Sequence, residues 1–348
     1  AMGGAAIGDG NIAIGYQSMQ DANDAGFHRN TAVGYQTMQG VGSNSATDNS
    51  VFGWRAGYSL TTGDNNTFLG VSAGAASTDV DRAIAIGYEA MGADNATSAA
   101  DGTVAVGWRA GYSINSGIGN IAIGYEALKV EDDGHYSTAI GYQALSSQTG
   151  TSAEVGNTAV GYQALTSATT GGDNDAFGRA AGHDITTGAN NLCLGNLAGT
   201  SGGPNGAITS NSNLIVIGNN SHTACSIKVS LTVTSDERDK TDITDFTKGL
   251  DIINALRPVT YKWDMRSNYE DGKPDGTKKE SKTNIGLIAQ EVLTVEKANG
   301  FGATNDDSLF VSQTNDGENF GMSYDRLVPV LVNAIKELST RVTALEAG

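Results

Sequence analysis

The feature that most constrains this chain is a repeat of 17 to 20 residues centred on a glycine. The glycines stand at positions 15, 34, 53, 70, 87, 107, 124, 141, 161, 178, 195 and 218, and only the last step, of 23 residues, is longer. The residue before each glycine is apolar, and the third residue after it is always Ala, Ser or Thr. A period of this length indicates a solenoid, because one unit buries its apolar strip only by stacking on its neighbours.

Each repeat has the pattern of a short strand that enters a tight bend. Apolar residues alternate before the glycine, and Gly, Asn, Asp and Thr fill the segments between strands. The uniformly small third residue indicates that a neighbouring backbone comes close. The side chains of one coil are small, so the core of one chain would be thin, and three chains around an axis would thicken it. The residues therefore predict a mainly β fold of stacked coils over residues 1–226.

The repeats resemble two known families. The run Asn-Thr-Ala-Val-Gly-Tyr-Gln-Ala-Leu at residues 157–165 is similar, letter by letter, to repeats of phage tail fibres. The pattern also resembles the heads of trimeric autotransporter adhesins, which implies a trimeric left-handed parallel β-roll. The period is longer than in the adhesin head, so extra loops should project at each coil, and we expect receptor contacts there.

Aromatic residues follow the central glycine in most repeats and form a ladder by register. One interpretation is a platform on which sugars of a receptor stack. The alternative is packing of outer strands against the roll. The ladder is absent from the last three repeats, which carry Arg179, Asn196 and Asn219. The candidate receptor contacts are Tyr16, Tyr35, Trp54, Tyr88, Trp108, Tyr125, Tyr142 and Tyr162.

Charge and composition narrow the function classes. The net charge of −17 makes nucleic acid and anionic lipid poor partners. No apolar run approaches the ~18 residues that would cross a bilayer. Cys193 and Cys225 lack metal-ligand spacing, the four histidines are dispersed, and we expect neither a metal nor a cofactor. Cys193 stands where most repeats have Ala, and we interpret it as a buried core residue.

The repeats show no carboxylate pair in a form suited to glycoside hydrolysis. Only four glutamates precede Ser235, and Asp173 and Asp175 are interpreted as a solvated loop tip. An aspartate pair would still serve that chemistry. We expect no turnover enzyme in the repeat domain.

A second, α+β domain is predicted over residues 235–348, because the glycine-rich composition ends after Thr234: residues 1–234 hold 38 of the 47 glycines. Residues 227–234 are predicted to be a linker strand that leads to it. Helices are expected over 248–256 and 325–346, a strand over 259–263, and a strand that enters a helix over 284–292.

The last predicted helix carries a heptad seam, because its apolar residues are separated by alternating steps of three and four. β-branched residues at a with Leu at d favour a dimer by the general rule. The segment from Arg341 to Glu346 resembles a known trimer signature, and we expect a trimeric coiled coil. The trimerisation residues are Val328, Leu331, Ile335, Leu338, Arg341, Val342, Leu345 and Glu346.

The C-terminal domain resembles the autoproteolytic intramolecular chaperone domain of endosialidase tailspikes. The resemblance rests on Ser235-Asp-Glu-Arg with Lys240, on Gly-Leu-Ile-Ala-Gln-Glu-Val at 286–292, and on Tyr-Asp-Arg-Leu-Val-Pro-Val-Leu at 324–331. It implies a chain break between Thr234 and Ser235, with Ser235 as the nucleophile and Lys240 as the general base.

This pair must meet two chemical conditions. A serine hydroxyl needs a base to take its proton, and a lysine is that base only when desolvation or nearby positive charge lowers its pKa. Five helical residues rotate by about 140°, so Ser235 and Lys240 need a turn between them or a partner from another chain. The alternative interpretation is that Ser235 caps a turn and Lys240 is a solvated charge.

Together these features predict a homotrimeric tail-fibre tip of a virion, made in the host cytoplasm, that recognises a host-surface receptor, expected to be a glycan. Its C-terminal chaperone would drive trimer folding and leave by one self-cleavage. Two alternatives stay open: a glycan-degrading tailspike enzyme and a bacterial trimeric surface adhesin.

Overall fold

In the computed structural model the chain divides into two compact units, Ala1–Ser221 and His222–Gly348. The structure describes residues 8–22, 25–40, 44–93, 96–150, 154–204, 206–314, 317 and 319–348. The repeats lie in the first unit, and the segment with chaperone-like motifs lies in the second.

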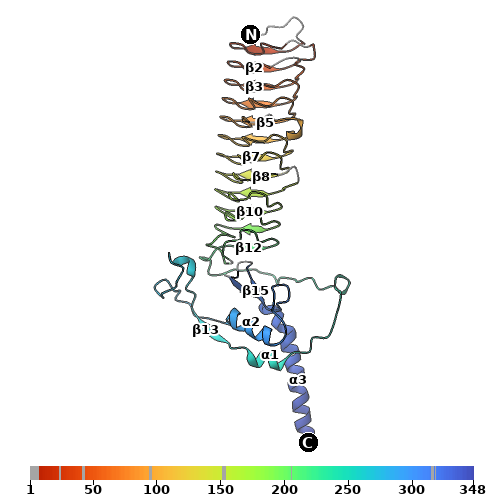
Figure 1. Cartoon of the computed structure of the whole chain (residues 1–348), viewed down its shortest axis with the longest axis vertical. Helices are drawn as coiled ribbons and strands as arrows, with labels where there is room; N and C mark the ends of the chain where they lie inside the picture. Colours follow the sequence, from red (N-terminus) through yellow and green to blue (C-terminus); the bar gives the residue numbers. More distant parts are fainter. Residues whose placement is uncertain are drawn as a thin grey trace. The chain divides into compact units, whose positions relative to one another are not determined.

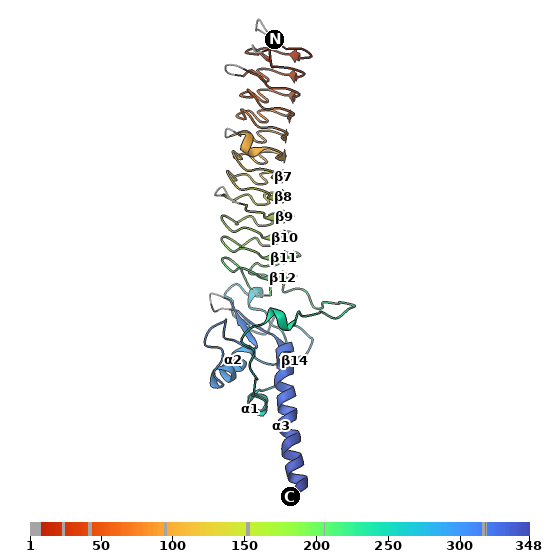
Figure 2. The same ribbon diagram turned by 90° about the vertical axis from the view of Figure 1, so that its right-hand side faces the viewer.

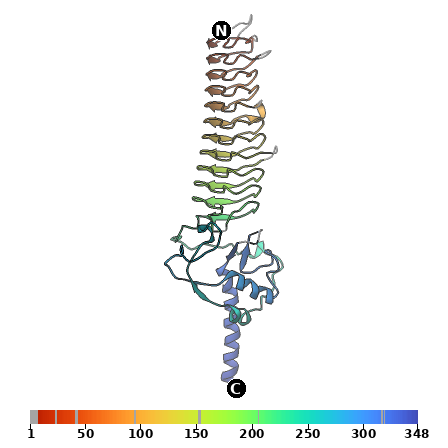
Figure 3. The same ribbon diagram turned by 60° about the vertical axis from the view of Figure 1, so that its left-hand side comes forward.

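The first unit is a β-solenoid in which each coil contributes one short strand to a parallel sheet of twelve described strands (Figure 1). Consecutive strands pair in sequence order and in constant register, and the arrows align along one side of the stack (Figure 3). This confirms the predicted mainly β solenoid. The strands are β1 (Ile12–Ile14), β2 (Thr31–Val33), β3 (Ser50–Phe52), β4 (Thr67–Leu69), β5 (Ile84–Ile86), β6 (Val104–Val106), β7 (Ile121–Ile123), β8 (Thr138–Ile140), β9 (Thr158–Val160), β10 (Asp175–Phe177), β11 (Leu192–Leu194) and β12 (Ile215–Ile217).

The central glycines form a column along the stack, and the structure gives two reasons for the residue type. All twelve have φ between +78° and +145°, where a side chain is strained. Most also lie against the glycine of the next coil: a Cβ on Gly107 would come within 2.3 Å of the Gly124 carbonyl oxygen. The glycine therefore ends the strand and permits neighbouring coils to lie close together.

The core of the solenoid lies behind the strand centres. Ala32, Ala85 and Cys193, at the centres of three strands, are fully buried, which confirms the interpretation of Cys193 as a core residue. Phe68 takes the same position in β4, and there the opposing space is vacated by glycine, because a Cβ on Gly74 would lie 2.6 Å from the Phe68 ring. Larger core side chains thus require smaller neighbours.

A ladder of buried asparagines runs beside the core, four residues before the glycines of most repeats. The Nδ2 of Asn49 donates to Asn30 Oδ1 at 2.9 Å, and the Nδ2 of Asn66 donates to Asn49 Oδ1 at 3.0 Å. Each of these side chains also donates to a backbone carbonyl of the coil, at 2.9 Å for Asn49 and 2.7 Å for Asn66. The ladder satisfies polar groups that the thin core would otherwise leave unpaired.

The residues on either side of each strand centre point away from the core and are partly exposed. Leu69 is 48% exposed and Phe177 is 41% exposed. The largest of these exposed side chains form what we call the strand-flank stripe: Ile12, Ile14, Phe52, Leu69, Ile84, Ile123, Ile140, Phe177, Ile215 and Ile217. A single chain therefore leaves apolar surface uncovered along its sheet.

The second unit is a small α+β assembly. Its helices are α1 (Leu250–Ala255), α2 (Ala289–Ala298) and α3 (Leu327–Ala347), with 3₁₀ turns η2 (Glu237–Asp239), η3 (Arg266–Asn268) and η4 (Tyr324–Arg326). Strand β13 (Val259–Tyr261) pairs antiparallel with β14 (Asn284–Gly286), and β15 (Val311–Gln313) pairs antiparallel with β16 (Phe320–Met322). The predicted helices and strands after residue 247 are confirmed within a few residues. The core consists of Ile252, Val292, Phe310, Val311 and Val330.

The predicted linker strand over residues 227–234 is wrong. These residues form no strand in the structure, and their alternating apolar side chains are exposed, from 54% at Ile227 to 81% at Leu231. A strand is held by hydrogen bonds to a neighbour, and the described part of this chain supplies none here. Alternation alone was an insufficient signal.

Helix α3 has two different faces and extends well beyond the other elements of its unit (Figure 1). Val330 and Ala334 are buried on the face toward α1, where a Cβ on Gly249 would lie 2.6 Å from the Ala334 amide nitrogen. The predicted heptad seam lies elsewhere on the helix: Ile335 is 65% exposed and Leu345 is 82% exposed. No helix in the described residues has the length and apolar character needed to cross a membrane.

Candidate functional site

The structure brings the side chains of Ser235 and Lys240 into direct contact. Lys240 Nζ donates to Ser235 Oγ at 2.6 Å and to the Ser235 carbonyl oxygen at 3.2 Å. Ser235 directly follows Thr234. Its hydroxyl therefore lies beside the Thr234–Ser235 peptide bond, where the family resemblance implies cleavage. The predicted partners are therefore adjacent within one chain.

A single 3₁₀ turn produces this contact. The Asp236 carboxylate caps η2 by accepting from the Arg238 amide at 2.9 Å, and the Lys240 amide donates to the Glu237 carbonyl at 3.1 Å. The Arg238 guanidinium also binds Asp236, and this hydrogen bond holds the pKa of the Asp236 carboxyl below its usual range. The sequence left two arrangements open, a turn between Ser235 and Lys240 or a partner from another chain. In the structure the turn brings the two side chains together.

Both members of the pair are exposed to solvent in a single chain. Exposure keeps a lysine hydrated and favours its charged form, whereas a general base must be able to accept a proton. The geometry for proton transfer is present, and the desolvation that the chemistry demands is not supplied by the described residues of one chain.

The two other chaperone-like blocks, at residues 286–292 and 324–331, contact each other. The Leu287 amide donates to the Tyr324 hydroxyl oxygen at 2.9 Å. Gly286 makes room for that hydroxyl, because a Cβ there would lie 2.6 Å from it. Burial raises the pKa of the neighbouring Tyr261 hydroxyl, and the electrostatic interaction with the Tyr324 hydroxyl adds to the effect. In the described part of the chain, no side-chain hydrogen bond of Ser235 or Lys240 reaches these blocks.

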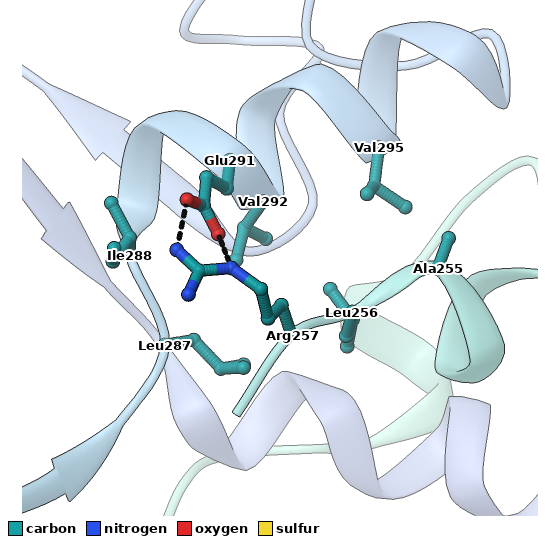
Figure 4. A pocket seen from close by; sticks show the side chains of 8 residues that line it. All are labelled: Ala255, Leu256, Arg257, Leu287, Ile288, Glu291, Val292 and Val295. Atoms are coloured by element: carbon teal, nitrogen blue, oxygen red, sulfur yellow. Dashed lines mark hydrogen bonds and ion pairs between the residues drawn. The ribbon is translucent and has the colours of Figure 1, made fainter. Parts of the chain in front are cut away.

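An ion pair covers a small apolar pocket beside α2. Figure 4 shows Arg257 lying along α2, with its guanidinium bound to the Glu291 carboxylate through both oxygens. The hydrogen bond to Arg257 lowers the pKa of Glu291. The pocket beneath is lined by the side chains of Ala255, Leu256, Leu287, Ile288, Val292 and Val295. Glu291 belongs to the second chaperone-like block, and its role here is to fix α2 against the end of α1.

The aromatic ladder exists, but it is interrupted. Trp108 and Tyr125 stack with ring centres 4.7 Å apart, and Tyr125 and Tyr142 stack at 4.9 Å. One run of stacked rings spans Tyr16, Tyr35 and Trp54, and the second spans Tyr88, Trp108, Tyr125, Tyr142 and Tyr162. The rings remain partly exposed and pack on one another, so no outer strand of the described residues covers them. Their role as receptor contacts stays a prediction.

Carboxylates in the repeats differ in their surroundings. Glu131 is fully buried and accepts from the Gly134 amide at 2.6 Å and the Gly150 amide at 2.8 Å. Asp173 and Asp175 are exposed beside an open groove of about 260 Å³ formed at β10 to β12. Within the described ranges, no group of three or more His, Cys, Asp or Glu residues could hold a metal ion.

Comparison with known proteins identifies only the C-terminal region. The family model described as chaperone of endosialidase matches residues 235–301, beginning at Ser235 itself. No curated protein and no solved structure matches the chain. The chain thus joins a β-solenoid to a region similar to the endosialidase chaperones.

Two features of the site were missed in the sequence. The asparagine ladder was attributed to turn chemistry, although its constant place four residues before the glycine was a visible signal. The interruption of the aromatic ladder at Val71 was also visible, because that repeat alone among the first nine lacks an aromatic residue after its glycine.

Proposed function

We propose that the chain is the receptor-binding end of a trimeric phage tail fibre or tailspike, and that its C-terminal unit directs assembly and is then cut off between Thr234 and Ser235. The observation that carries this proposal is the 2.6 Å contact between Ser235 Oγ and Lys240 Nζ at the first residue of the region similar to endosialidase chaperones.

The proposed reaction is an acyl transfer followed by hydrolysis. Neutral Lys240 Nζ takes the hydroxyl proton as Ser235 Oγ forms a bond to the Thr234 carbonyl carbon. The carbon–nitrogen bond between the two residues then breaks, and the Ser235 amine receives the proton. Water hydrolyses the resulting Thr234 ester, which leaves a carboxylate on Thr234 and restores the Ser235 hydroxyl.

Assembly is the proposed source of the missing desolvation. In one chain the pair is open to water, so we expect the site to be silent in the free monomer. When neighbouring chains cover the pair, the lysine loses hydration and becomes a base. Cleavage would therefore follow assembly and report its completion.

Two exposed apolar surfaces support the proposal that three chains associate. The strand-flank stripe runs along the solenoid, and the heptad seam runs along α3. Contiguous apolar surface on a soluble protein marks an interaction site. Both surfaces repeat along a single element, as expected where identical chains pack in register around a common axis. We propose a homotrimer because the solenoid core is thin and the last two turns of α3 carry the trimer-like segment Arg341–Glu346.

A removable chaperone fits the folding problem of the repeats. Neighbouring coils look alike, with the same strand register at every step, so three chains could pair one coil out of step. A C-terminal unit that associates first would set the register before the coils close. Its release then leaves the stack with a high barrier to unfolding.

The proposed partner is a host-surface glycan, bound by the aromatic ladder or by the loops of the coils. Exposed aromatic side chains combine an apolar body with polar groups, which suits recognition of sugars. The groove beside Asp173 and Asp175 favours the glycan-degrading alternative to a lesser degree, and release of reducing ends from host polysaccharide would support that alternative.

The proposal is tested by expressing the full chain and its variants. We expect the wild type to give two fragments on a denaturing gel, with the C-terminal fragment starting at Ser235, and Ser235→Ala and Lys240→Ala each to give one band near 35.7 kDa. Ser230→Ala, a nearby exposed serine outside the pair, should cleave as the wild type does. Light scattering should give the mass of three chains.

A single full-length band from the wild type, or cleavage that persists in Ser235→Ala, would show that the pair does not cut the chain. A monomeric mass at all concentrations would remove the fibre proposal.

A further inference from the structure

The aromatic ladder lacks one rung. Trp54 ends the first run of stacked rings and Tyr88 begins the second, two coils further along. The coil between them carries Val71 at the ladder position and Ser72 next to it, and Val71 is 40% exposed. Two ring-bearing coils therefore border a position that holds only a short aliphatic side chain.

At this gap two rings of the ladder lack an aromatic neighbour. Inside a run, each ring stacks on a neighbour on both sides, with planes within 17° of parallel, so a ligand would meet only ring edges. Trp54 and Tyr88 have no aromatic partner on the side of Val71 among the described residues, although Trp54 is 46% exposed and Tyr88 is 43% exposed. A ligand ring can stack on the ladder only at such ends.

The width of the gap matches one ring. Successive coils are about 4.8 Å apart, so two coils separate Trp54 and Tyr88 by about 10 Å. A ring centred between them would lie about 5 Å from each. Within the two runs, neighbouring ring centres are 4.7 to 6.5 Å apart, which brackets this distance.

A cation also lies beside Trp54, the first ring that borders the gap. The Arg55 guanidinium lies 4.1 Å from the centre of the Tyr58 ring and 5.3 Å from the Trp54 ring, and its buried Nε has no hydrogen-bond partner among the described residues. The corresponding Arg109 binds the Glu89 carboxylate of the preceding coil at 2.6 Å. In the coil before Arg55, the position of Glu89 is taken by Gln36, whose side chain carries no charge.

We propose that the vacant rung between Trp54 and Tyr88 binds one pyranose ring that bears a carboxylate, such as a uronic acid of an acidic glycan. The two ring faces enclose the sugar over Val71, and Arg55 pairs with its carboxylate. This rests on the proposed role of the chain in receptor binding and names the class of sugar. With 38 acidic against 21 basic residues, the surface repels anions generally, so selectivity for an acidic sugar requires a local cation such as Arg55.

The test uses the full chain as it is purified, with methyl β-D-glucuronide and methyl β-D-glucoside as probes, followed by tryptophan fluorescence and ligand-observed NMR. We expect the glucuronide to bind more tightly than the glucoside. Val71→Tyr completes the ladder with a residue that other coils carry at this position, and should weaken glucuronide binding by at least about ten-fold while the protein stays folded. Arg55→Gln should abolish the preference for the glucuronide.

Arg109→Gln, at the corresponding position of another coil, is the matched control and should bind both sugars as the wild type does. Equal binding of the two sugars, no binding of either, or glucuronide binding unaffected by Val71→Tyr would each overturn the proposal. A cleaved trimer that binds neither sugar would refute the proposed sugar site and leave the fibre proposal standing. An uncleaved monomer that binds the glucuronide through Val71 and Arg55 would instead remove the fibre proposal and leave the site.

Discussion

The glycine column offers the sharpest test of the reasoning about the fold, through Gly107→Ala. Gly107 has φ of +140°, and a new Cβ would lie 2.3 Å from the Gly124 carbonyl oxygen. Reaching ordinary contact at 3.4 Å requires the coils to move apart by about 1 Å. That movement would break the hydrogen bonds from Gly124 to Val106, from Glu126 to Trp108 and from Val104 to Asn120, which measure 2.8, 2.9 and 2.9 Å.

Three such bonds at about 1 kcal/mol each give a loss of about 3 kcal/mol. Backbone strain adds about 1 to 3 kcal/mol, since this φ is essentially reserved for glycine. Gly102→Ala, in the same coil, separates the two effects, because Gly102 has φ of +72° but no atom within 4 Å of its added Cβ. It should cost only the strain, about 1 to 2 kcal/mol.

The assay is urea unfolding of the full chain, followed by circular dichroism of the sheet, with Gly102→Ala and Gly107→Ala side by side at one protein concentration. We expect the midpoint of Gly107→Ala to fall well below that of Gly102→Ala, or the variant to fail to fold. Equal losses in the two variants would refute the argument that close approach of neighbouring coils selects the glycine.

Two further predictions concern the cysteines and an ion pair. Burial raises the pKa of the Cys193 thiol to about 11, whereas Cys225 is exposed; a thiol reagent at neutral pH should therefore label one cysteine in the native chain and two after unfolding, and fast labelling of Cys193 in the native state would contradict the packing. The lowered pKa of Glu291 means that its pairing with Arg257 stabilises the fold above the usual carboxyl pKa and is lost as pH falls through the lowered value. In a Ser235→Ala background, Glu291→Gln should lower the melting temperature at pH 7 and approach the parent protein in acid, while Glu270→Gln, at an exposed glutamate, should show no such convergence.

Much of the solenoid could be predicted because its backbone geometry has a one-residue signature. A positive φ and a close neighbouring backbone exclude every side chain, so Gly15 and its counterparts mark each coil in the sequence. The positions two residues later, such as Gln17 and Arg55, also have positive φ, of 52° and 55°, but they do not require glycine. Side chains of many types occupy those positions, so the pattern leaves no trace.

The strand over 227–234 could not be settled from sequence for the opposite reason. Ile227 and Leu231 alternate with polar residues as a strand would, but a strand also needs a partner edge, which depends on the whole assembly. The turn between Ser235 and Lys240 is local and is held by the Asp236 carboxylate, which accepts from the Arg238 amide, whereas the sequence left a turn and a partner from another chain both open. Whether that pair becomes buried depends on surfaces from outside the single chain.

The unequal repeat lengths have a consequence for how such a protein can change. The step between Ile84 and Val104 is 20 residues rather than 17, yet these residues pair in the same register as every other coil. The additional residues lie in the connection that holds the 3₁₀ turn η1 (Ser98–Ala100), drawn in orange in Figure 2. Connections can thus be lengthened, shortened or exchanged between coils without disturbing the hydrogen-bonded stack. Under the proposed receptor-binding role, specificity would diversify through these segments as interchangeable cassettes, while the scaffold that carries them is inherited unchanged.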